Sequence, residues 1–340
     1  MEIECRVAAE LLVKRGRVEE RGREYGAAEK TFDEAIGLLR RAPRDRLLVD
    51  ALRWKGNVHL HTGRTAEAVE CYRESLATAK ALKDDAGWAH VLNCLGVTAQ
   101  RTGAVDRAEA LYQEAAIRAL QAGEHRLQGM VEHNLGTLAN IRGDFDAALV
   151  RYRMSLQALR RVGDEAEESR VLNDLGMLYT DLKRFVDAEE VLARAARIAR
   201  RRGDRLVEGV VSANLGEVYV MTARWAEAEA ACARSLEIAG ELGDPLQRAE
   251  ALRVWGSLAR AKREDDQARR ALEEAGEIAR GKQDALLLAE VLLQLGEVSY
   301  ARGDSGSARE AWEQAVGWFR TVGARRDVEG VGVRLAALAA

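Results

Sequence analysis

Four asparagines lie within stretches whose apolar spacing predicts helices, where asparagine is an unfavourable residue. They are Asn57, Asn93, Asn140 and Asn173. Asparagine disfavours helix interiors because its side chain competes for backbone hydrogen bonds. A primary amide can donate to and accept from a peptide group at the same time. A row of amides can therefore hold an extended peptide without reading its sequence, or can join neighbouring parts of the protein's own fold. The sequence leaves both interpretations open.

Histidines and arginines form two further groups with possible ligand chemistry. His59, His61, His90 and His133 fall in predicted helices, and imidazole is a common metal ligand. No carboxylate or cysteine accompanies them at ligand spacing, so we predict no metal site. Six arginines between positions 194 and 205 resemble a nucleic-acid patch. They fall at the end of a predicted helix, where cations complement the helix dipole. We therefore expect a solvated helix end and no nucleic-acid partner.

The sequence lacks the motifs that commonly carry catalysis. It has no phosphate-binding Gly-x-x-x-x-Gly-Lys-Ser/Thr loop, no His-Glu-x-x-His pair and no calcium-binding loop. No serine or cysteine lies in the context of a nucleophile elbow. We therefore predict that the chain is not an enzyme and binds no cofactor.

Composition argues against several classes of partner. The net charge is −3, and the 52 basic and 55 acidic residues are interleaved, which favours neither nucleic acid nor an anionic membrane. The four cysteines have no paired spacing, as in proteins of reducing compartments. Charged residues interrupt the N-terminus, so no signal-peptide core is present. No apolar run approaches the roughly 18 residues that a membrane span needs. These features predict a cytoplasmic protein.

An internal repeat predicts the structural units that carry these side chains. Eight glycines are spaced 40 residues apart, from Gly16 to Gly296. Eight alanines, from Ala28 to Ala308, follow their glycines by 12 residues. Copied units of this length stack upon one another as solenoids. The periodicity therefore predicts one repeated structural unit throughout the chain.

Each unit reads as two helices and two turns. In residues 165–204, Leu172, Leu175 and Tyr179 recur at helical spacing, and a second apolar series begins at Ala188. A glycine stands between the two helices in several units: Gly63, Gly103, Gly143 and Gly303. Glycine after a helix end tolerates positive φ. We therefore predict a helix A, a turn, a helix B and a second turn in every unit.

The repeated glycine itself lies within helix A. Glycine in a helix costs about 1 kcal/mol relative to alanine, so its recurrence indicates a packing requirement. We expect the alanine of helix B to press against this glycine. The bulky residue four positions after the alanine, such as Tyr72 or Tyr112, would fill the remaining seam.

These offsets carry a resemblance to a known repeat. Leu175-Gly176 with Tyr179 and Ala188 resembles the tetratricopeptide repeat. The 40-residue period is longer than the usual 34 or so. It is similar to the subclass in kinesin light chain, in adaptors with Leu-Gly-Asn repeats and in sensor arms of bacterial regulators.

The resemblance implies an all-α fold in one superhelical array over residues 1–340. This array would be a right-handed α-solenoid of about eight helix-turn-helix repeats at about 5–324. A capping or partial-repeat helix would follow at 325–340.

In this family helix A lines a concave groove, which implies a set of binding residues. They are Arg53, Asn57, His90, Asn93, Arg101, His133, Thr137, Asn140, Arg170, Asn173, Met177 and Glu217. The implied function is a non-enzymatic scaffold that binds a peptide or a partner helix in this groove. The alternative is a sensing arm of a larger bacterial signalling regulator, such as an ATPase, a kinase or a transcription factor. The partner would then be a ligand or a domain of the same longer protein.

Overall fold

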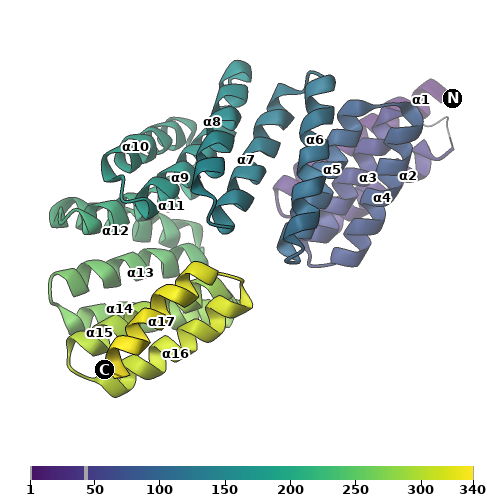
Figure 1. Ribbon diagram of the computed structural model, residues 1–340. Coiled ribbons are helices and arrows are strands. Elements are labelled where there is room, and N and C mark those ends of the chain that lie inside the picture. Colours follow the sequence, from purple (N-terminus) through teal and green to yellow (C-terminus); the bar gives the residue numbers. More distant parts are fainter. Residues whose placement is uncertain (1, 42–44, 340) are drawn as a thin grey trace. The chain divides into compact units, whose positions relative to one another are not determined.

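The chain folds into helices joined by short turns. A computed structural model describes residues 2–41 and 45–339, and this part holds seventeen α-helices and no strand (Figure 1). The first helices of the pairs are α1 (Glu2–Arg21), α3 (Arg46–His61), α5 (Asp85–Arg101), α7 (His125–Ile141), α9 (Glu165–Asp181), α11 (Arg205–Met221), α13 (Pro245–Ala261), α15 (Ala285–Ala301) and α17 (Arg325–Ala339). The second helices are α2 (Tyr25–Leu39), α4 (Thr65–Leu82), α6 (Val105–Gln121), α8 (Phe145–Val162), α10 (Phe185–Arg202), α12 (Trp225–Leu242), α14 (Asp265–Lys282) and α16 (Ser305–Thr321). The prediction of an all-α solenoid of helix pairs is confirmed.

The helices group into two compact units. The first unit comprises the chain up to residue 139 together with residues 146–163. The second comprises residues 140–145 together with the chain from residue 164 onward. In the first unit α3 contacts α4 and α4 contacts α5, and in the second unit α9 contacts α10 and α10 contacts α11. The single array over residues 1–340 stays a prediction.

The repeated glycines face their own helix B, as predicted. A methyl group at Gly56 would lie 2.4 Å from Cε1 of Tyr72, and one at Gly176 would lie 2.4 Å from Cγ of Leu192. The contact residue is therefore the bulky side chain 16 positions after the glycine. The expectation that the alanine presses against the glycine was wrong. Ala68 is fully buried, but the ring of Tyr72 stands opposite the glycine and occupies the space that a Cβ would need.

The turns also follow the repeat. Gly63, Gly103 and Gly303 have φ of 78°, 76° and 80°, which confirms the predicted left-handed turns. Where the sequence has no glycine the same conformation is kept, because Lys183 and Arg263 have φ of 58° and 62°. A non-glycine residue in this region costs roughly 1–2 kcal/mol. The stacking of the helix pairs therefore fixes the turn even against local preference.

Two tyrosines of helix B reach back to the polar side of helix A. The Tyr72 hydroxyl donates to Oδ1 of Asn57 at 2.7 Å, and the Tyr112 hydroxyl donates to Oε1 of Gln100 at 2.9 Å. Burial raises the pKa of both hydroxyls, so they remain protonated donors. The tyrosines that pack between the two helices of a pair thus also orient amide side chains on helix A. In the described part of the chain, no helix is both long and apolar enough to span a bilayer.

Candidate functional site

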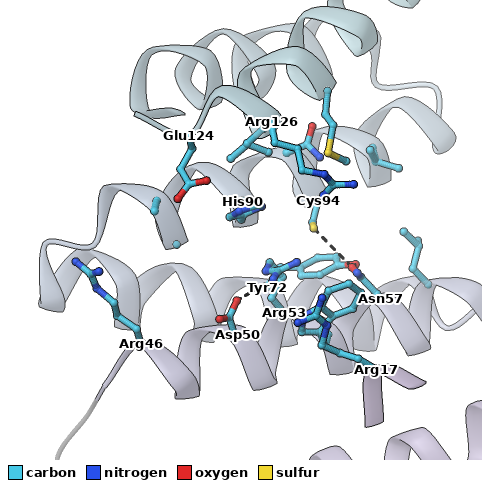
Figure 2. Close-up of a pocket in the computed structure, with 18 of the residues that line it drawn as sticks. Arg17, Arg46, Asp50, Arg53, Asn57, Tyr72, His90, Cys94, Glu124 and Arg126 are labelled. Carbon is cyan, nitrogen blue, oxygen red and sulfur yellow. Dashed lines mark hydrogen bonds and ion pairs between the residues drawn. The ribbon is translucent and has the colours of Figure 1, made fainter. Parts of the chain in front are cut away.

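The first unit contains a cavity of about 620 Å³ (Figure 2). Its walls come from α1, α3, α5 and α7, the first helices of successive pairs, with Tyr72 contributed by α4. The structure places five predicted groove residues on this wall: Arg53, Asn57, His90, Asn93 and Arg101. Figure 2 shows Arg126 of α7 facing the floor on which Arg53 and Asn57 lie.

Asn57 is held by its carbonyl oxygen. Its Oδ1 accepts from the Tyr72 hydroxyl at 2.7 Å and from Sγ of Cys94 at 3.6 Å. Both donors belong to the surrounding scaffold, so they fix which end of the amide faces inward. The Asn57 amide donates no hydrogen bond to any described residue, which leaves two N–H donors on a side chain that lines the cavity.

Arg53 is buried against Trp54 with only part of its bonding capacity used. The residue is 9% exposed, and its Nη2 donates to Oδ1 of Asp50 at 2.8 Å. Its guanidinium carbon lies 4.7 Å from the Trp54 ring centroid, and that of Arg17 lies 4.9 Å from the same centroid. The Nε atoms of both arginines are buried without a hydrogen-bond partner among the described residues. An unsatisfied buried donor costs about 1–3 kcal/mol.

His90 contributes a neutral ring to this cavity. Burial, assisted by the charges of Arg53 and Arg126 and opposed by Asp50, lowers the pKa of His90 to about 4. The imidazole is therefore uncharged at neutral pH and presents one donor and one acceptor nitrogen.

Hydrogen-bond donors outnumber acceptors on the cavity wall. Five arginines and three acidic residues line it: Arg17, Arg46, Arg53, Arg101 and Arg126, with Asp50, Asp84 and Glu124. Asp50 pairs with Arg53, and Asp84 lies 3.4 Å from Nε of Arg46. This surplus suits a ligand rich in oxygen acceptors. No group of three or more His, Cys, Asp or Glu side chains could hold a metal ion in the described residues.

Two of the predicted groove asparagines form bonds between successive repeats. Oδ1 of Asn93 accepts from Nδ2 of Asn134 at 2.9 Å, and Oδ1 of Asn173 accepts from Nδ2 of Asn214 at 2.8 Å. Asn93 and Asn173 are each 8% exposed. Their oxygens therefore join parts of the fold, and contact of these two residues with a ligand stays a prediction.

The other predicted groove residues do not line this cavity. In the first unit, Thr137 donates to the backbone oxygen of His133 at 3.2 Å. In the second unit, Arg170 pairs with Glu167 on its own helix. Three more belong to the second unit: Asn140, which is half-buried, Met177, which is exposed, and Glu217, which is half-buried. Their role in binding also stays a prediction.

Several cavity residues were not predicted from the sequence, among them Arg17, Trp54 and Arg126. Arg17 follows Gly16 as Asn57 follows Gly56, so the predicted row of groove positions reaches it when extended back by one repeat. Trp54 and Arg126 lie at other positions of their repeats and had no such signal.

The arginine run at 194–205 is not merely a solvated helix end. Arg194 pairs with Glu168 at 2.6 Å, and Nε of Arg200 lies 3.4 Å from Glu208. The side chains of these two glutamates are 8% and 3% exposed. A buried carboxylate needs a cation nearby, and these arginines supply it across neighbouring helices.

The sequence also matches a known family. Profiles of the tetratricopeptide repeat match residues 52–86, 88–161, 127–201 and 167–241. Together these segments span more than half of the chain. The chain belongs to the tetratricopeptide repeat family. Comparison with curated proteins gave no significant match.

Several solved tetratricopeptide-like structures share the fold. The apo form of the quorum sensor NprR from B. thuringiensis has a TM-score of 0.71 at 11% identity, covering 92% of this chain and 88% of its own. A signal transduction ATPase with numerous domains and a tetratricopeptide repeat sensor, from Pyrococcus horikoshii, has a TM-score of 0.66 at 14% identity, covering 95% and 50%. Aspartyl phosphate phosphatase F from Bacillus subtilis has a TM-score of 0.66 at 11% identity, covering 87% and 75%. At these identities the similarity shows a shared fold and nothing more.

Proposed function

We propose that this tetratricopeptide chain is a non-enzymatic interaction module whose first-unit cavity binds an extended segment of a partner protein. The observation that carries the proposal is the orientation of Asn57. Tyr72 and Cys94 hold its oxygen, so its N–H donors remain for the carbonyl groups of a bound backbone. The cavity adds arginine donors and apolar wall residues such as Val97 and Met130. Apolar walls with a few fixed polar groups are typical of binding sites.

The chemistry of the cavity supports binding and argues against catalysis. Cys94 and His90 both line it and lie four residues apart on α5, and cysteine with histidine forms a nucleophile–base pair in some enzymes. Here burial raises the pKa of the Cys94 thiol and lowers that of His90. The thiol also donates to Asn57. A protonated thiol whose neighbouring imidazole is a weak base is a poor nucleophile. We therefore propose no reaction, although one structural relative is named a phosphatase.

Site-specific photo-cross-linking tests the proposal. A photoreactive residue at position 97 stands on the cavity wall. The same residue at position 154 replaces Met154, which is 39% exposed on α8 and does not line the cavity. We expect one partner segment, mapped by mass spectrometry, to be attached at position 97 and not at position 154. Attachment at position 154 alone, or equal attachment at both, would contradict the proposal.

A second candidate function is a sensing arm of a larger signalling regulator. It is favoured by the similarity to half of an ATPase that carries a tetratricopeptide repeat sensor. The same cross-linking distinguishes the two functions, using the protein expressed from its complete gene. A segment of the same polypeptide attached at position 97 supports the sensing arm, and a segment of another protein supports the interaction module.

A further inference from the structure

Two positions of each first helix are buried against the helix pair that precedes it. The first position lies five residues before the repeated glycine, and from Gly56 to Gly296 it carries a fully buried valine or alanine: Ala51, Val91, Val131, Val171, Val211, Ala251 and Val291. The preceding second helix lies close by, because a methyl group at Gly276 on α14 would be 3.4 Å from Cγ1 of Val291 on α15. The second position lies two residues after the glycine and is also buried: Val58, Thr98, Leu138, Leu178, Val218, Leu258 and Val298.

Helix α1 carries apolar residues at these two positions, but they are exposed. Leu11 and Val18 are 61% and 68% exposed, and Val7, one turn before Leu11, is 52% exposed. The opposite side of α1 is already buried in the first unit through Ala9 and Val13. A terminal repeat of a solenoid ordinarily has a polar outer face. The outer face of α1 is instead apolar, as is typical of a surface that packs against another helix.

The outer face of α1 differs from the face on which repeats stack. Leu11 is larger than the valine or alanine that the later repeats have at this position, and an added methylene in a closely packed seam is destabilising. Val7, Leu11, Lys14 and Val18 follow one another at intervals of four, three and four residues. This is the spacing of two helices that pack along their length. The face therefore fits one helix lying along it better than it fits another repeat.

We infer that the outer face of α1, formed by Val7, Leu11, Lys14 and Val18, packs against the same face of a second copy of this chain, with the two helices antiparallel. This arrangement sets Val7 opposite Val18 of the second copy. It also sets Leu11 opposite the aliphatic stem of Lys14, whose ammonium group can stay in water. A two-fold axis between the helices repeats each of these contacts.

The charges beside this seam favour the antiparallel direction. Glu10 lies level with Arg15 of the second copy and next to its Lys14. These three side chains are all more than half exposed, and in the single chain they pair only within α1: Glu10 with Lys14 and Arg15 with Glu19, each at 2.7 Å. In a parallel pair in register each residue would instead lie beside its own kind, so that Lys14 would face a second lysine. Opposite charges attract in the first arrangement and like charges repel in the second.

Self-association of the full chain tests the inference. Analytical ultracentrifugation over a range of concentrations should show a dimer, and we expect Leu11→Asp to weaken it about tenfold or more, because a carboxylate would be buried in the seam. Leu120→Asp is the matched control, because Leu120 on α6 belongs to the same unit and is also 61% exposed. Both variants change exposed residues, so both should melt as the parent does. A parent that stays monomeric, or two variants that associate equally, overturns the inference.

Charge reversal tests whether the second copy is the occupant. Glu10→Lys makes the side of the seam wholly basic, and Lys14→Glu with Arg15→Glu makes it wholly acidic. We expect each of these variants alone to associate more weakly than the parent, and their mixture to form a mixed dimer. Glu74→Lys is the control, because Glu74 pairs with Arg40 on the exposed face of the same unit, and it should associate as the parent does. A mixture that associates no better than its components contradicts the inference.

Cross-linking tests the direction of the two helices. Oxidation of a mixture of Val7→Cys and Val18→Cys should link position 7 of one copy to position 18 of the other. In an antiparallel pair the two positions 7 lie about 16 Å apart along the axis, which is too far for a disulfide. The parent, with its own four cysteines, is the blank, and mass spectrometry identifies the linked positions. A link between two positions 7, or no link above the blank, contradicts antiparallel pairing.

The outer face of α1 can be tested apart from the proposed function. Val7, Leu11 and Val18 do not line the first-unit cavity. A failure of self-association therefore leaves the cross-linking of a partner at position 97 as a separate result.

Discussion

Asn57 and Asn93 occupy neighbouring repeats, but their amides are held in different ways. The oxygen of Asn57 is bonded by Tyr72 of its own helix pair, whereas that of Asn93 is bonded by Asn134 of the next repeat. The first arrangement points donors toward a cavity. The second joins two repeats within the stack. Two asparagines on the same wall therefore differ in their bonds: one is held by its own helix pair, and the other joins two repeats.

The cohesive role of Asn93 makes a prediction about stability. We expect Asn93→Ala and Asn134→Ala each to destabilise the protein by about 1 kcal/mol, with a coupling energy of roughly 0.5–1.5 kcal/mol. The measurement is urea unfolding of the parent, both single variants and the double variant. Additive effects with no coupling would show that the 2.9 Å bond between the two amides contributes nothing.

Glu290 gives the second unit a dependence on pH. Burial, opposed by Arg253 and reinforced by Glu250, Glu217 and Asp327, raises the pKa of Glu290 from 4.5 to about 7. The folded state therefore keeps a proton that the unfolded state has lost between these values. Stability from this group is complete below pH 4.5 and is lost as pH rises through 7.

Glu290→Gln should remove this dependence. As pH rises from 4.5 to 7, the parent should lose roughly 1 kcal/mol of unfolding free energy that the variant keeps. This value is reduced for the partial exposure of the carboxyl group. The difference should then stay constant above pH 7. Urea unfolding at several pH values checks this, and a constant difference across the whole range would show that Glu290 ionises with an ordinary pKa.

At the scale of the helix pair, the glycine–aromatic contact fixes how closely helices A and B approach. A methyl group at Gly96 would lie 2.5 Å from Cε1 of the buried Tyr112. We expect Gly96→Ala to destabilise the protein by about 1–3 kcal/mol, because the ring has no room to move.

The control for this substitution is another helical glycine. Gly317 lies in α16, and a methyl group there would have no atom within 4 Å. Gly317→Ala should stabilise the protein by up to about 1 kcal/mol, through helix propensity alone. Thermal unfolding of both variants gives the comparison. Similar shifts of the melting temperature would mean that the seam tolerates a side chain.

The sequence predicts the helices of this molecule better than it predicts the contacts between their side chains. The 40-residue spacing of Gly56, Gly96 and their counterparts predicts the helix pairs, because each copy repeats the same packing requirement. The spacing does not show that Tyr72 rather than Ala68 meets the glycine, since that depends on side-chain direction across the pair. Arg263 adopts the left-handed turn without glycine because its neighbours in the stack impose it.

The cavity was only partly predictable for a related reason. Their positions relative to the repeated glycine predict that Asn57 and Arg53 lie on the same face of helix A, and both line the cavity. Whether Asn93 bonds to Asn134 or faces a ligand depends on distances between repeats, which a single sequence does not contain. Arg17 and Asn57 each follow the repeated glycine of their own repeat. That Arg17 places a second positive charge near Arg53 is seen only when the structure is compared with Arg253, which has Glu217 at that position.

At the scale of the whole chain, the same position of the repeat carries an arginine in both units, but the number of carboxylates around it differs. In the second unit, Arg253 is satisfied by carboxylates from its own fold. In the first unit, Arg53 has one carboxylate and borders a cavity. Repeat proteins can vary a side chain in one copy without disturbing the packing of the others, because each repeat contacts only its neighbours. We propose that the partner binds at the first-unit cavity, where the Nε of Arg53 is buried without a hydrogen-bond partner among the described residues.

The most direct test is the affinity of the partner segment itself. The segment identified at position 97 is synthesised, and its dissociation constant is measured by calorimetry for the parent, Arg53→Gln and Arg40→Gln. We predict about tenfold weaker binding or more for Arg53→Gln, as for loss of a charge-assisted hydrogen bond, with the affinity of Arg40→Gln unchanged. Equal affinities of Arg53→Gln and the parent, in a variant that remains folded, would contradict the account that this cavity binds the partner.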